Sequence, residues 1–200
     1  MATAAGERTL RVDAQRNHDR IVVAAHEAFA EQGYGVSIED IARRAGVGTA
    51  TVYRRFPNKE RLLRAVFDAR LAELGMAIGV ARAAQDPWDG LLAGIRAVIQ
   101  IQAANMVFLQ ILAQLGVLPE LKGEIRERVF APLGELFARA QASGQLRADL
   151  DPAELPLLIG MVAATAKQHD QREPAVNWDR YLTLLTDALR TPAPTPLPPR

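Results

Sequence analysis

Apolar residues recur at the three- and four-residue spacing of an amphipathic helix along almost the whole chain. No stretch alternates apolar and polar residues for long enough to predict a strand. The pattern therefore predicts an all-α fold. The expected helices cover residues 17–32, 37–45, 49–55, 58–81, 88–115, 120–143, 152–168 and 176–190.

Short polar and glycine signals divide the first sixty residues into three helices. Gly33 is a natural stop for the first helix, and Ser37 is a good N-cap for the second, with Asp40 three residues later. Gly46 supplies the backbone conformation of a tight turn, and Pro57 forces the third helix to end. Two short helices joined by a glycine-containing turn predict helix-turn-helix geometry.

Composition excludes several classes of protein but selects none. The net charge is +1, with an excess of three positive charges over residues 1–64 and of two negative charges over the remainder. The absence of cysteine removes thiolate nucleophiles, disulfides and cysteine-bound zinc. Because no apolar run is long enough for a spanning helix and residues 1–12 do not resemble a secretory signal, we expect a cytoplasmic protein without a membrane partner.

Residues suited to catalysis or metal binding do not cluster in the sequence. His18, His26 and His169 are too far apart to predict a metal site, so structural or solvent-exposed roles are expected. The chain has two serines and no nucleophile elbow of the Gly-x-Ser-x-Gly type. Gly46–Gly48 faintly resembles a dinucleotide-binding loop, but a helix rather than a strand precedes it. We expect no enzyme activity, metal or cofactor.

The second helix of the helix-turn-helix is rich in hydroxyl groups and arginines. Its helical register turns Val52 and Phe56 toward the core. The opposite face presents hydrogen-bond donors that suit base edges and phosphates. These outward residues are Thr49, Thr51, Tyr53, Arg54 and Arg55.

Residues 37–48 and 51–63 together resemble the signature of the TetR family of bacterial repressors. The chain departs from the common pattern at Ala50, where many members have glycine, and at Arg55, where many have histidine. The resemblance implies that Tyr53, Lys59 and Ser37 contact phosphates while the outward threonines and Arg54 face the major groove. The full set of predicted DNA-binding residues is Ser37, Gly48, Thr49, Ala50, Thr51, Tyr53, Arg54, Arg55 and Lys59.

The resemblance also implies an N-terminal three-helix helix-turn-helix DNA-binding domain and a C-terminal helical domain for ligand binding and dimerisation. We place a flexible basic arm over 1–16, the DNA-binding domain over 17–64, the second domain over 65–190 and a Pro-rich disordered tail over 191–200. Eight residues of the second domain are candidates for a ligand site. The alternative is that they fill an ordinary core. They are Trp88, Gln102, Asn105, Met106, Phe108, Leu112, Phe137 and Met161.

Two functional hypotheses follow. In the first, the protein is a homodimeric transcriptional repressor, paired through helices at about 152–168 and 176–190, that binds palindromic double-stranded operator DNA and is released by a small-molecule effector. In the second, it is a helical small-molecule-binding protein or enzyme whose helix-turn-helix is only a fold element. The same C-terminal helices would then pack only within one chain.

Overall fold

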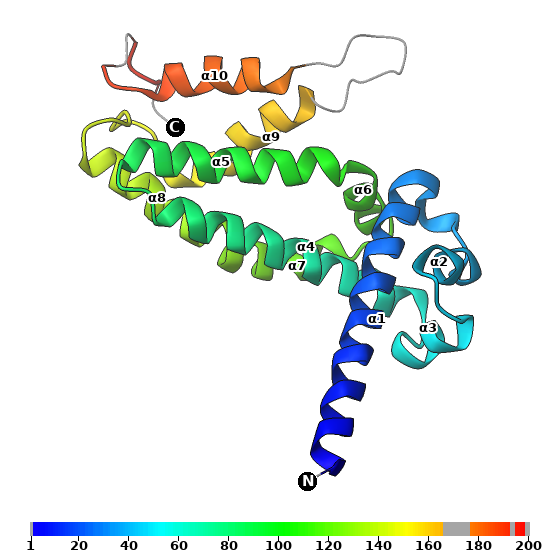
Figure 1. Ribbon diagram of the computed structural model, residues 1–200. Coiled ribbons are helices and arrows are strands. Elements are labelled where there is room, and N and C mark those ends of the chain that lie inside the picture. The colour runs from blue at the N-terminus through cyan, green and yellow to red at the C-terminus, as the bar shows by residue number, and fades with distance from the viewer. Residues whose placement is uncertain (1, 166–176, 193–194, 199–200) are drawn as a thin grey trace. The chain divides into compact units, whose positions relative to one another are not determined.

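The computed structural model describes residues 2–165, 177–192 and 195–198 (Figure 1). Regular structure throughout these residues is helical, apart from one isolated antiparallel bridge between Leu146 and Arg190. This confirms the all-α prediction. The chain divides into an N-terminal unit, residues 1–70 with 107–115, and a C-terminal unit, residues 71–106 with 116–200.

The N-terminal unit contains the three predicted short helices and parts of two others. Its first helix begins at Ala2 rather than near Asn17, because the preceding residues are mostly good helix formers without proline. The elements are α1 (Ala2–Gln32), η1 (Gly33–Gly35), α2 (Ile38–Ala45), α3 (Thr49–Arg55), the first half of α4 (Lys59–Arg82) and most of α6 (Met106–Gln114). Its core includes Ile21, Ala25, Phe29, Ile41, Val52, Leu62 and Val66.

The prediction of one helix over 88–115 is wrong. The structure has two helices, α5 (Pro87–Ala104) and α6, interrupted at Asn105. The side-chain Nδ2 of Asn105 donates to the carbonyl of Ile101 at 2.6 Å, and its backbone N–H bonds Gln102 rather than Ile101. Such local side-chain bonds compete with the helical ladder and end it.

The α6 helix packs against α1 inside the N-terminal unit. The Phe108 ring is almost fully buried, with its centroid 6.5 Å from that of Phe29 and 6.3 Å from that of His26. A helix that follows α5 in sequence therefore contributes an aromatic residue to the core formed by α1.

The C-terminal unit is a set of helices in which α5 packs against α8 and α9, and α9 against α10. The helix predicted over 120–143 is present as α7 and α8, joined by a five-residue π-helical turn. Besides the second half of α4 and α5, the elements are α7 (Leu118–Ile125), η2 (Arg126–Phe130), α8 (Ala131–Ala142), η3 (Pro152–Glu154), α9 (Leu155–Thr165) and α10 (Trp178–Leu189).

Two glycines of α5 allow neighbouring helices to approach closely. A Cβ atom at Gly90 would lie 2.9 Å from the carbonyl oxygen of Ala81 on α4. A Cβ atom at Gly94 would lie 2.8 Å from a methyl group of Leu133 on α8. The absence of a side chain at these positions is what permits this packing.

The described part of the Pro-rich tail is hydrogen-bonded to the loop after α8. The backbone N–H of Thr191 donates to Gln145 O at 3.0 Å, and that of Leu197 donates to an Asp149 carboxylate oxygen at 2.9 Å. The Arg147 guanidinium donates both to Asp149 and to the carbonyl of Thr195. The Arg147 bond and the Leu197 N–H together hold the pKa of Asp149 well below its ordinary value.

No single helix in the described ranges has the length and apolarity to cross a membrane; only the interrupted pair Pro87–Ala103 and Val107–Gln114 meets both criteria when taken together.

Candidate nucleic-acid interface

The turn between α2 and α3 is fixed by capping at both ends of α2. The Ser37 hydroxyl accepts from Asp40 N at 3.0 Å and donates to the Asp40 carboxylate at 2.6 Å, which lowers the pKa of Asp40. At the other end, Gly46 adopts φ 64°, and Val47 N donates to Ala42 O at 3.0 Å. These bonds set the direction in which α3 leaves α2.

Side chains from α1 and α2 hold this turn in place. The Arg20 guanidinium donates to Gly46 O at 3.2 Å, and any Cβ at Gly46 would lie 2.6 Å from the same nitrogen. Arg44 of α2 makes two hydrogen bonds with the Glu31 carboxylate, which lowers the pKa of Glu31. The left-handed backbone conformation at Gly46 therefore favours glycine, and a side chain there would also displace the end of the Arg20 side chain.

The α3 helix has one buried and one exposed face. Val52 is fully buried and Phe56, just after the helix, is 5% exposed. Tyr53 is 46% exposed, and Arg54 and Arg55 are exposed as well. The remaining predicted residues of this segment are half-buried or exposed, namely Gly48, Thr49, Ala50 and Thr51.

Lys59, in the first turn of α4, has partners that the sequence did not predict. Its ammonium donates to the carbonyl oxygens of Tyr34 and Val36, the latter at 2.5 Å, and lies 4.5 Å from the centroid of the Tyr34 ring. The Tyr34 hydroxyl in turn donates to Glu60 at 2.8 Å. Burial lowers the pKa of Lys59, and burial with the Glu60 carboxylate raises the pKa of Tyr34 to about 12.

This arrangement ties the segment before α2 to the start of α4. An ammonium group has three N–H donors, so the two carbonyl oxygens leave one for a phosphate. The phosphate contact of Lys59 remains a prediction. So does that of Ser37, whose hydroxyl already bonds Asp40.

Sequence reasoning missed two contributions from α1. Arg20 supports the turn through Gly46, and His18 accepts a hydrogen bond from Arg55 Nε at 3.3 Å. The available signal was the helical spacing of His18 and the buried Ile21, which places both on the side of α1 that faces α3.

The residues predicted to line a ligand site are divided between the two units. Phe108 and Leu112 are buried in the N-terminal unit, whereas the others with described side chains belong to the C-terminal unit. There, Phe137 is fully buried and Met161 is 66% exposed. The Met106 side chain lies outside the described part of the structure.

The polar and aromatic members of that set have partners of their own. The Trp88 ring is covered by the Arg190 guanidinium at 4.7 Å, and the Asn105 side chain bonds the carbonyl of Ile101. Gln102 is half-buried on α5. Their role as ligand contacts remains a prediction.

Comparison with known proteins agrees with this geometry. Residues 21–66 match the family model described as bacterial regulatory proteins, tetR family, and residues 86–191 match that of the SbtR-like transcriptional regulator C-terminal domain. The chain belongs to the TetR family of transcriptional regulators. The TetR N-terminal match spans α2 and α3 together with the parts of α1 and α4 that pack on them.

Several TetR regulators are similar over most of the chain. A TetR regulator from Mycobacterium vanbaalenii is 33% identical with a TM-score of 0.72, covering 91% of this chain and 99% of that one. A second, from Streptomyces coelicolor, is 31% identical with a TM-score of 0.70, covering 88% and 99%. The transcriptional regulator SrpR of Pseudomonas putida is 26% identical over 149 residues, which are 72% of this chain and 70% of SrpR. These relatives are regulators and not enzymes.

Proposed function

We propose that the protein is a repressor that binds palindromic operator DNA as a homodimer and is released by a small-molecule effector. The observation that carries the proposal is the exposed face of α3, where hydroxyl, phenol and guanidinium groups stand on a helix whose other face is buried. In this arrangement Thr49, Thr51 and Arg54 read base edges, while Ser37, Tyr53 and Lys59 hold phosphates. Gly48, Ala50 and Arg55 complete the interface.

Exposed apolar side chains on α9 and α10 support the homodimer. These two helices pack on each other within one chain (Figure 1). They nevertheless leave Leu157, Met161 and Leu184 exposed at 71%, 66% and 61%, and Tyr181 at 44%. A second copy would bury these groups through a two-fold contact, and each square ångström of apolar surface removed from water contributes roughly 25 cal/mol.

The DNA-binding part is tested by selecting duplexes from a random library with the full chain and then measuring affinity for the enriched sequence. We expect enrichment of a palindrome with half-sites centred roughly 34–36 Å apart, one helical turn. The Thr51→Ala variant should change the enriched sequence, since a base contact is lost. Weak retention of every sequence alike would contradict the proposal and favour a small-molecule binder without operator recognition.

The dimer is tested by light scattering on the Leu184→Glu variant. A buried charge at a two-fold contact is costly, so we expect monomers and a loss of cooperative operator binding. Val80→Glu is the matched control, because Val80 is 76% exposed on α4, a helix that contributes no residue to the proposed contact. Dimers of unchanged affinity in the Leu184→Glu variant would rule out this surface.

The effector is tested by calorimetric screening of small molecules against the protein, followed by operator titration in the presence of each binder. A coupling of about 1–3 kcal/mol should lower operator affinity roughly 5- to 150-fold. If the binders leave operator affinity unchanged, the switching part of the proposal fails while DNA binding stands.

A further inference from the structure

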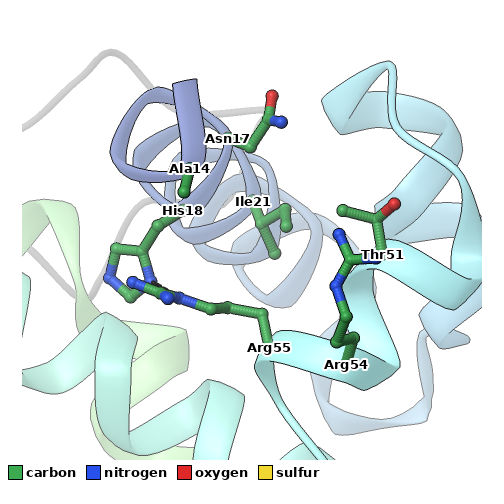
Figure 2. Close-up of a pocket in the computed structure, with 7 residues that line it drawn as sticks. All are labelled: Ala14, Asn17, His18, Ile21, Thr51, Arg54 and Arg55. Atoms are coloured by element: carbon green, nitrogen blue, oxygen red, sulfur yellow. Dashed lines mark hydrogen bonds between the residues drawn. The ribbon is translucent and has the colours of Figure 1, made fainter. Parts of the chain in front are cut away.

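A groove between α1 and α3 carries positive charge beside the exposed face of α3. Its volume is about 140 Å³, and Ile21 forms its apolar floor. Figure 2 shows the Arg55 side chain reaching toward His18, while Arg54 runs beside Thr51. The full lining is Ala14, Asn17, His18, Ile21, Thr51, Arg54 and Arg55.

The two arginines of this groove lack acidic partners within the described residues. By contrast, other arginines of the N-terminal unit pair with carboxylates, as in Arg43–Asp40, Arg44–Glu31 and Arg64–Asp68. Arg54 and Arg55 make no such pair with any described residue, and Arg55 donates instead to the ring nitrogen Nδ1 of His18. A groove lined by guanidinium, amide and hydroxyl donors, with no carboxylate among its lining residues, is complementary to an anion.

The contacts of His18 in the free protein favour its neutral form. Its Nδ1 accepts from Arg55 Nε at 3.3 Å, so that nitrogen carries no proton, and its ring packs on Phe56 with centroids 5.2 Å apart. Burial and the Arg55 charge lower the pKa of His18, against the opposing charge of Asp19.

We infer that this groove binds a backbone phosphate of the operator, and that His18 takes up a proton when the phosphate enters. The inference rests on the proposed DNA binding by α3. Thr51 and Arg54 belong both to the groove and to the face proposed to read bases. A duplex that meets this face therefore brings one of its strands against the flank formed by α1.

The proton uptake follows from the donors available. Arg55 turns its N–H from the imidazole to a phosphate oxygen, which leaves His18 Nδ1 without its donor. His18 then takes up a proton from solvent, keeps it on Nδ1, and donates a hydrogen bond from that N–H to the same phosphate. The negative charge of the phosphate offsets the repulsion between the imidazolium and Arg55. The complex thus binds one more proton than the free protein, so affinity rises as pH falls through the window between the free and the bound pKa of His18.

The test is fluorescence anisotropy with the selected operator, measured between about pH 6 and pH 8 at constant ionic strength. For one linked proton, affinity of the wild-type protein should rise by up to about tenfold per pH unit on lowering the pH. The His18→Gln variant keeps an acceptor for Arg55 but cannot titrate, so its affinity should be nearly independent of pH. The His26→Gln variant is the control and should retain the wild-type dependence.

The phosphate contact is tested separately. Arg55→Gln should weaken binding to all sequences and reduce the slope of log affinity against log salt by about one unit. Imidazole NMR signals of His18 should show a pKa that rises when operator duplex is added and changes little with inorganic phosphate alone.

The outcomes separate this inference from the proposed function. If the wild-type protein selects no operator, the proposed function fails and the inference falls with it. If operator binding and the effect of Thr51→Ala stand, but His18→Gln keeps the wild-type pH dependence or Arg55→Gln keeps the salt slope, the inference alone is overturned. A His18 response to inorganic phosphate without a response to duplex would overturn it as well.

Discussion

Replacement of Lys59 by methionine distinguishes the two roles of this residue. The change keeps the length of the side chain but removes its charge and its bonds to the carbonyl oxygens of Tyr34 and Val36. Hydrogen bonds to charged groups contribute about 1.5–3 kcal/mol each, and a cation over an aromatic ring about 0.5–1 kcal/mol. Since the half-buried ammonium also loses hydration in the folded state, we expect a net loss of roughly 2 kcal/mol in the free energy of unfolding.

The same variant should bind DNA less tightly for a second reason. If the third N–H of Lys59 contacts a phosphate, Lys59→Met reduces the slope of log affinity against log salt by about 0.9 and weakens binding to all sequences alike. Urea unfolding measures the first effect, and anisotropy titrations at several salt concentrations measure the second. Lys122→Met is the matched control, because Lys122 is exposed on α7 and should leave both quantities unchanged.

The result that would refute this reasoning differs for each role. An unfolding free energy equal to that of the wild-type protein would mean that the carbonyl bonds contribute nothing to stability. An unchanged salt slope would remove Lys59 from the phosphate contacts and leave it as a residue that positions the start of α2.

Four further substitutions test local features. Gly90→Ala should lower the unfolding free energy by about 1–3 kcal/mol, because the new methyl group meets α4. Gly123→Ala lies on open helix surface and should raise the unfolding free energy by up to about 1 kcal/mol. Equal effects of the two variants in urea unfolding would contradict the packing argument. Gly46→Ala should cost at least about 1 kcal/mol from its left-handed backbone and weaken operator binding in anisotropy; wild-type affinity would argue against a fixed turn. The pKa of Asp149 is lowered in the folded protein, so the stability that its carboxylate contributes is present above about pH 4 and is lost as the pH falls below it. The melting temperature of the Asp149→Asn variant should therefore fall less steeply with decreasing pH than that of the wild-type protein. Parallel curves of melting temperature against pH would contradict this.

The helix-turn-helix could be predicted from sequence because its determinants are local. The Ser37 cap, the positive φ of Gly46 and the stop at Pro57 each act within a few residues, and the structure has α2 and α3 where these signals place them. The burial of Val52 and Phe56 follows from helical spacing alone and is confirmed.

The remaining features depend on contacts between distant residues. The break at Asn105 is stabilised by a side-chain bond that competes with a continuous helix, and apolar spacing alone could not reveal it. The bonds of Lys59 to carbonyls more than twenty residues away, and of Arg55 to His18, arise only when the helices are packed. Sequence identified Lys59 and Arg55 as part of the site but not what they touch within the protein.

The position of α6 affects how this regulator can be divided or recombined. A gene fragment that ends at Arg70 would omit Phe108 and expose the aromatic surface of Phe29 that it covers. Chimeras that graft the first seventy residues onto a foreign sensor would therefore need a replacement for this helix, or would inherit an incomplete core. The first seventy residues of the N-terminal unit and the α6 helix that completes their core are separated along the gene, so a cut chosen by sequence position alone would not yield an independently folding domain.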